Sequence, residues 1–105
     1  MQKNIFGKLP TGEEIYSYKI ENSEIYAEII TYGARLRSFG RIGHDNIVGS
    51  FDTLEDYTLD DSFQGAIIGR IADRTANAQF TIDGIEYNLP KNAGNDCNYF
   101  HNTSL

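Results

Sequence analysis

The chain has 105 residues and a formal net charge of −6, with one cysteine, seven tyrosines, six phenylalanines and no tryptophan. A chain of this length forms one domain or part of one, and buries about 65% of its unfolded surface in one modest core. The acidic balance, with lysines and arginines scattered along the chain, argues against a nucleic-acid or membrane-surface partner.

The first strand signals come early in the chain. Residues 14–21 alternate polar and apolar side chains, with Tyr16, Tyr18 and Ile20 on one side, as in a half-buried strand. Residues 24–32 carry apolar side chains on both sides, which predicts a strand that lies inside a sheet.

The next segment predicts a turn, a strand and a short helix. Gly33 allows a turn or bulge, and residues 35–42 read as a third strand. A helix near residues 53–58 follows, which Asp52 could cap with Glu55 as its reciprocal partner.

Residues 80–89 give the clearest local signal. Asp83-Gly84 stands between two alternating segments, and this dipeptide favours a type I′ hairpin because both central residues need positive φ. Pro90 then blocks further strand pairing. Together these elements predict an all-β fold of antiparallel sheets with short strands.

The strongest candidates for a binding site lie between Gly65 and Arg74. This segment begins as an apolar run, which predicts a buried strand, and ends with Arg70, Asp73 and Arg74. Arginines at the end of a strand lie at the rim of a sheet, where their planar donors suit hydroxyl and carboxylate oxygens. A solvated loop in which the arginines pair with Asp73 or other local acids is the alternative, and it stays open.

The remaining reactive side chains show no site pattern. His44 and His101 lie far apart in the sequence, without metal-site spacing. Cys97 is the single cysteine, which excludes a disulfide framework and predicts a plain free thiol. Residues 1–6 lack the apolar run of a signal peptide and no segment reaches transmembrane length, so we expect a cytoplasmic protein.

Five segments in register resemble the aldose 1-epimerase (galactose mutarotase) family, over nearly the whole chain. In chain order they are Ile5-Phe6-Gly7 with Thr11-Gly12, residues 30–36 (ITYGARL, similar to NYGA-x-L), residues 48–57 (VGSFDTLEDY, similar to LGFDTLEDY), residues 65–74 (GAIIGRIADR, similar to GA-x-x-GR-x-ANR) and residues 80–90 with Asn92 (similar to F-x-LDG-x-x-Y-x-LP-x-N). One such match alone is weak, whereas five in the family's order are specific.

The resemblance implies a galactose mutarotase-like β-sandwich that interconverts the α and β anomers of aldoses, galactose and glucose among them, without a cofactor or a metal. By motif, the family's sugar-holding Asn-Arg pair falls on Asp73 and Arg74, and its first sugar-contacting histidine falls on His101. Asp73 departs from the pattern, because a carboxylate only accepts hydrogen bonds whereas an amide also donates. At His101 the spacing from Gly94 is longer than in the family, and Asn102-Thr103 replaces two glycines.

The family's general acid histidine and general base glutamate lie in segments beyond those matched here. We therefore expect residues 1–105 to be the N-terminal fragment of a single domain, which contributes substrate-holding residues and no catalytic residue. Because a fragment of a sandwich leaves apolar surface uncovered, we also expect self-association through exposed strand edges. A non-catalytic sugar-binding or regulatory protein of the same fold, or an inert fragment, stays open as an alternative.

Overall fold

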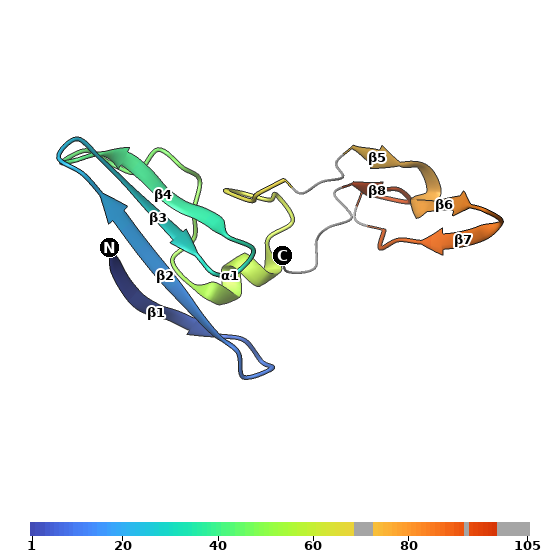
Figure 1. Ribbon diagram of the computed structural model, residues 1–105, viewed down its shortest axis with the longest axis horizontal. Helices are drawn as coiled ribbons and strands as arrows, with labels where there is room; N and C mark the ends of the chain where they lie inside the picture. The colour runs from blue at the N-terminus through green and yellow to red at the C-terminus, as the bar shows by residue number, and fades with distance from the viewer. Residues whose placement is uncertain (69–72, 92, 99–105) are drawn as a thin grey trace. The chain divides into compact units, whose positions relative to one another are not determined.

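The computed structural model describes residues 1–68, 73–91 and 93–98, and the chain divides into two units after Ile67. The first unit is a four-stranded antiparallel sheet with one short helix, and the second contains two two-stranded ladders (Figure 1). The mainly β, antiparallel architecture with one short helix confirms the predicted fold class. Among the described residues, no helix has the length and apolar character needed to cross a bilayer.

The sheet of the first unit has the strand order β1-β2-β3-β4. Its strands span Gln2–Lys8 (β1), Glu14–Glu21 (β2), Ile25–Ile30 (β3) and Arg35–Arg41 (β4). β3 lies between β2 and β4, which confirms the prediction that this segment is inside a sheet. The sequence pattern does not predict β1, because polar side chains occupy most of its positions without a period of two.

The buried face of this sheet is the one opposite to the tyrosines of β2. Successive side chains alternate between faces, so Ile15 and Ser17 share one face while Tyr16, Tyr18 and Ile20 share the other. Ile15 and Ser17 are only 2% and 7% exposed, whereas Ile20 is 44% exposed. The prediction of a half-buried strand is confirmed, but the side with Tyr16, Tyr18 and Ile20 is the more exposed one, which we call the open face.

The helix α1 (Leu54–Leu59) covers the buried face. Leu54 and Tyr57 of the helix pack with Ile15 and Ile30 of the sheet in one core. The ring of Tyr57 meets that of Phe51 edge-on at 5.1 Å, and its hydroxyl accepts a hydrogen bond from the N–H of Phe51 at 3.2 Å. The ring is therefore buried without leaving its hydroxyl unpaired.

The helix is capped one residue later than the sequence predicts. Its N-cap is Thr53, whose Oγ1 accepts a hydrogen bond from the N–H of Asp56 at 3.3 Å and donates one to the Asp56 carboxylate at 3.0 Å. The predicted cap Asp52 is instead an exposed side chain, 3.9 Å from Arg37. Thr-x-x-Asp and Asp-x-x-Glu offer the same capping-box spacing one residue apart, so the local pattern does not decide between them.

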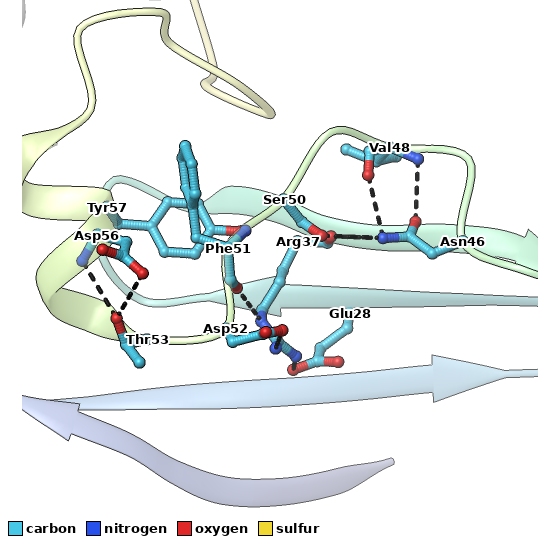
Figure 2. A network of polar contacts seen from close by, with 10 residues as sticks. All are labelled: Glu28, Arg37, Asn46, Val48, Ser50, Phe51, Asp52, Thr53, Asp56 and Tyr57. Atoms are coloured by element: carbon cyan, nitrogen blue, oxygen red, sulfur yellow. Dashed lines mark hydrogen bonds and ion pairs between the residues drawn. The ribbon is translucent and has the colours of Figure 1, made fainter.

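A network of polar side chains fixes the loop between β4 and the helix (Figure 2). Arg37 lies at a β-bulge between β3 and β4, where its Nε donates to the carbonyl oxygen of Phe51 at 3.2 Å and its Nη1 donates to Glu28 at 2.9 Å. Asn46 binds both the N–H and the carbonyl oxygen of Val48 through its side-chain amide, at 3.0 and 3.1 Å. Side chains thus hold this loop in place of strand pairing.

A buried ion pair joins the start of β4 to the chain just after the helix. The Nη1 atom of Arg35 lies 3.0 Å from Oδ2 of Asp60, and the two side chains are 11% and 3% exposed. Ser62 and Gln64 also donate hydrogen bonds to this carboxylate. Burial acts to raise the pKa of Asp60, but the hydrogen bonds from Ser62, Arg35 and Gln64 outweigh it and lower the pKa to about 2.

The buried apolar strand predicted from Gly65 onward is not formed in its described part, and residues 69–72 lie outside the described residues. The carbonyl oxygen of Gly65 accepts one hydrogen bond from the N–H of Leu36 at 2.9 Å. Positive φ angles at Phe63 (58°) and Gly65 (67°) bend the chain here. Ile67 and Ile68 are consequently 51% and 62% exposed, because the bend ends the pairing with β4 that a buried strand would need.

The described part of the second unit contains four short strands and one 3-10 turn. They are β5 (Arg74–Thr75), η1 (Ala76–Ala78), β6 (Gln79–Ile82), β7 (Ile85–Asn88) and β8 (Cys97–Asn98). β5 pairs with β8, and β6 pairs with β7, in both cases antiparallel.

The hairpin of β6 and β7 confirms the sequence prediction. Asp83 and Gly84 have φ angles of 51° and 77°, which a type I′ turn requires. Across the pair, Phe80 and Tyr87 stack at 5.2 Å. The local turn signal and the cross-strand aromatic pair therefore specify the same register.

Replacing Asp60 with asparagine should lower the free energy of unfolding by about 2 kcal/mol at neutral pH, because the buried Arg35 loses its ionic partner. The pKa of about 2 in the folded state lies below the ordinary value of 3.8. The stabilisation by this carboxylate is therefore complete above about pH 4 and is lost as the pH falls toward about 2. Denaturant unfolding at a series of pH values should show that Asp60→Asn lacks this part of the pH dependence.

Asp61→Asn is the control for this experiment, because it removes the same charge from an exposed neighbouring side chain. If both variants had the same stability and the same pH profile, the ion pair would not be the cause of the effect.

Candidate functional site

The candidate residue Arg74 begins β5 (Arg74–Thr75), Asp73 directly precedes it, and both are exposed. Arg74 pairs with Asn98 and Thr75 pairs with Cys97, so β5 and β8 lie side by side (Figure 1). The ladder therefore holds the backbone of Arg74 against residues 97–98, the last that the structure describes.

Asp73 has an unusual backbone conformation that its own side chain supports. Its φ is 86°, in the region that residues other than glycine rarely adopt. Oδ1 of Asp73 accepts a hydrogen bond from the N–H of Arg74 at 2.8 Å. Aspartate and asparagine both tolerate positive φ and both offer a side-chain oxygen at this position, so this contact does not need the amide donor of asparagine.

The guanidinium of Arg74 is not engaged by Asp73. Among the residues with described positions, it takes part in no ion pair, and the carboxylate of Asp73 contacts the main chain of Arg74 instead. The five donors of this side chain are thus presented at the surface of the second unit. Arg70, the other arginine of the motif, lies outside the described residues.

The other candidate side chains from the sequence are His101, His44 and Cys97. His101 lies outside the described residues. His44 is exposed in the turn after β4, where its N–H donates to the carbonyl oxygen of Arg41 at 3.0 Å. Cys97 is a fully buried free thiol, and burial raises its pKa, which disfavours the reactive thiolate. Within the described part of the chain, no group of histidine, cysteine, aspartate and glutamate side chains could hold a metal ion.

Sequence reasoning misses Asp96, which directly precedes β8 and binds the turn that follows β5. Its Oδ1 accepts a hydrogen bond from the N–H of Asn77 at 2.9 Å, across 19 positions of sequence. Asn77 has φ 56° and ψ 16°, within the turn that follows β5. The only local signal is Gly94-Asn95, which marks a turn before Asp96 and does not indicate the partner of its carboxylate.

Asp73→Val should destabilise the ladder that contains β5 by about 1–2 kcal/mol, because a β-branched residue is strained at positive φ and cannot accept the hydrogen bond from Arg74. The free energy of unfolding of Asp73→Asn should stay within about 0.5 kcal/mol of that of the wild type, since asparagine keeps the acceptor oxygen. Amide hydrogen exchange at Thr75 and thermal unfolding measure these differences. Glu86→Val is a matched control in an extended strand, and a loss as large as that of Asp73→Val would show that backbone strain is not the cause.

The comparisons with known proteins agree with one another. Residues 16–102 match the family model described as aldose 1-epimerase. The chain is 33% identical over 95 residues to galactose mutarotase of Rattus norvegicus, and this match covers 86% of the chain and 28% of the relative. It is 32% identical over 99 residues to aldose 1-epimerase of Streptococcus thermophilus, with 89% and 28% covered.

A solved structure with a similar fold is that of galactose 1-epimerase from Lactobacillus acidophilus NCFM. It is 25% identical and superimposes with a TM-score of 0.69, over 93% of this chain and 30% of that one. The chain thus spans less than a third of the length of these relatives. With most of its length matched by the family model, the chain belongs to the aldose 1-epimerase family.

Proposed function

We propose that this chain holds an aldose, as the substrate-holding part of an aldose 1-epimerase. Membership of the family supports the substrate class. The observation that carries the proposal is the state of Arg74, which is exposed and has no ionic partner among the described residues. Its guanidinium is therefore available to donate hydrogen bonds to sugar oxygens.

The chemistry of Asp73 and Arg74 suits a neutral sugar. A guanidinium presents five donors in a fixed plane, which can reach neighbouring hydroxyl oxygens. Oδ1 of Asp73 is occupied by the N–H of Arg74, which leaves Oδ2 to accept from a sugar hydroxyl. Galactose and glucose offer both donors and acceptors and carry no charge, which fits a paired donor and acceptor on an acidic chain.

His101 is proposed as a further sugar contact on the strength of its motif alone. The chain contributes binding in this proposal, and the proton transfers of anomer interconversion belong to residues of the family outside the matched segments. A cytoplasmic location also stays a prediction, supported by the free thiol of the single cysteine, Cys97.

Arg74→Ala should weaken galactose binding by roughly tenfold or more, because hydrogen bonds from a charged donor contribute about 1.5–3 kcal/mol each. Titration of the 105-residue chain with galactose, followed by the amide shifts of Arg74 and Asn98 in ¹H–¹⁵N spectra, measures the affinity. Arg74→Lys should lose part of the binding, since it keeps the charge but not the planar fork. Arg41→Ala removes another exposed arginine and should bind galactose as the wild type does.

Two results would contradict the proposed function. One is the absence of any galactose-dependent shift in the wild-type chain at high sugar concentration. The other is binding that is unchanged in Arg74→Ala, which would place the sugar elsewhere.

We further propose that copies of the chain associate through the sheet of the first unit. β1 is an edge strand, and on the open face Ile5, Ile20 and Ile25 are 67%, 44% and 40% exposed. A shallow depression of about 350 Å³ lies on this face, and its lining includes Ile20, Ile25, Ala27 and Phe39. An uncovered apolar face beside an unpaired strand edge favours pairing with a second copy.

Light scattering should therefore show concentration-dependent dimers of the wild-type chain. Ile5→Lys should shift the population toward monomer, because it places a charge on the open face at the edge strand. Ile47→Lys is the control, since Ile47 is 76% exposed but lies outside the strands. A wild-type chain that stays monomeric at every concentration would rule out this association.

A further inference from the structure

The strand pair that carries Arg74 is very short. β5 and β8 pair through two residue pairs, Arg74 with Asn98 and Thr75 with Cys97. A two-stranded ladder is marginal by itself, so its register depends on contacts at its ends. One of these ends is the turn η1, which follows β5 directly.

The chain in this turn adopts a conformation that must be held by its surroundings. Asn77 and Ala78 have φ angles of 56° and 53°, in the left-handed region that L-residues rarely occupy in succession. Ala78 is 2% exposed, and its carbonyl oxygen accepts a hydrogen bond from the N–H of Leu89 at 2.7 Å. This contact holds the end of the turn that leads to β6, and the end that leads back to β5 needs its own support.

Asp96 supplies that support from the side of β8. Its Oδ1 accepts the N–H of Asn77 at 2.9 Å, directly beyond the paired residues Thr75 and Cys97. The bond thus ties the turn after β5 to the residue before β8 through a side-chain oxygen. The main chain of Asp96 is itself fixed, because it exchanges two hydrogen bonds with Ala93 at 3.1 and 3.2 Å.

We propose that Asp96 is a positioning residue for Arg74. Its carboxylate fixes the turn at Asn77, the turn keeps β5 in register with β8, and this register sets the point from which the guanidinium is presented. The described contacts of Asp96 are with the main chain of Asn77 and Ala93, so its role in this proposal is exerted through Arg74. The last step, from Arg74 to an aldose, rests on the proposed function, whereas the steps from Asp96 to Arg74 do not.

Three variants of the 105-residue chain test this inference. Asp96→Ala removes the acceptor, Asp96→Asn keeps a side-chain oxygen at the same place, and Glu86→Ala removes an exposed carboxylate from β7 of the same unit. The readouts are amide exchange at Asn77, the cross-strand nuclear Overhauser contacts between Arg74 and Asn98, and the dissociation constant for galactose. Circular dichroism checks that each variant keeps its strands.

In Asp96→Ala we expect protection of the Asn77 amide and galactose affinity each to fall by roughly tenfold or more, which is the effect of losing one hydrogen bond to a charged group. The contacts between Arg74 and Asn98 should weaken together with them. Asp96→Asn should restore all three, and Glu86→Ala should change none. This pattern separates positioning by one oxygen atom from a general effect of charge.

The inference is overturned if Asp96→Ala keeps the contacts between Arg74 and Asn98, or if the wild-type chain binds galactose and Asp96→Ala binds it equally tightly. A wild-type chain that binds no galactose would overturn the proposed function alone. In that case the contacts between Arg74 and Asn98 still decide the role of Asp96, since their loss in Asp96→Ala and their return in Asp96→Asn do not depend on sugar.

Discussion

The first unit depends on the burial of one side chain, Tyr57, between the helix and the sheet. The helix has six residues, too few to be stable alone, so it forms because this ring is buried against Ile15 and Ile30. In turn, the ring and Leu54 cover the face of the sheet that carries Ile15 and Ile30. The guanidinium of Arg35 lies 5.5 Å from the same ring while it pairs with Asp60, which makes the ion pair and the apolar core parts of one arrangement.

Local patterns predict most of the strands, because a period of two and an Asp-Gly turn are encoded by neighbouring residues. They do not predict which face of β2 is covered. The regular alternation of Tyr16, Tyr18 and Ile20 suggests a core face, yet the face with Ile15 and Ser17 is the buried one. That choice is made by the position of Tyr57, which is distant in sequence, and no pattern within β2 contains it.

The candidate site also has one part that local sequence predicts and one part that it does not. The motif that ends in Asp73 and Arg74 is local, and sequence reasoning finds it. The bond from Asn77 to Asp96 is not local, because it joins residues 19 positions apart and involves a backbone conformation that no composition rule specifies. From the sequence, aspartate at position 73 differs from the family's asparagine because it lacks the amide donor. In the structure, Asp73 accepts a hydrogen bond and has a positive φ, and aspartate meets both requirements as asparagine does.

An acidic chain offers many carboxylates to an exposed arginine, and one aspartate directly precedes each of the strands β5 and β8, Asp73 and Asp96. Each of them has an oxygen committed to a main-chain N–H, Asp73 to that of Arg74 and Asp96 to that of Asn77. Both bonds hold backbone at or beside a positive φ angle, so breaking either to pair with the guanidinium would release a strained conformation. A neutral sugar competes poorly with a carboxylate for a guanidinium. Because both carboxylates are bound to main-chain N–H groups, the guanidinium of Arg74 stays available to an uncharged ligand.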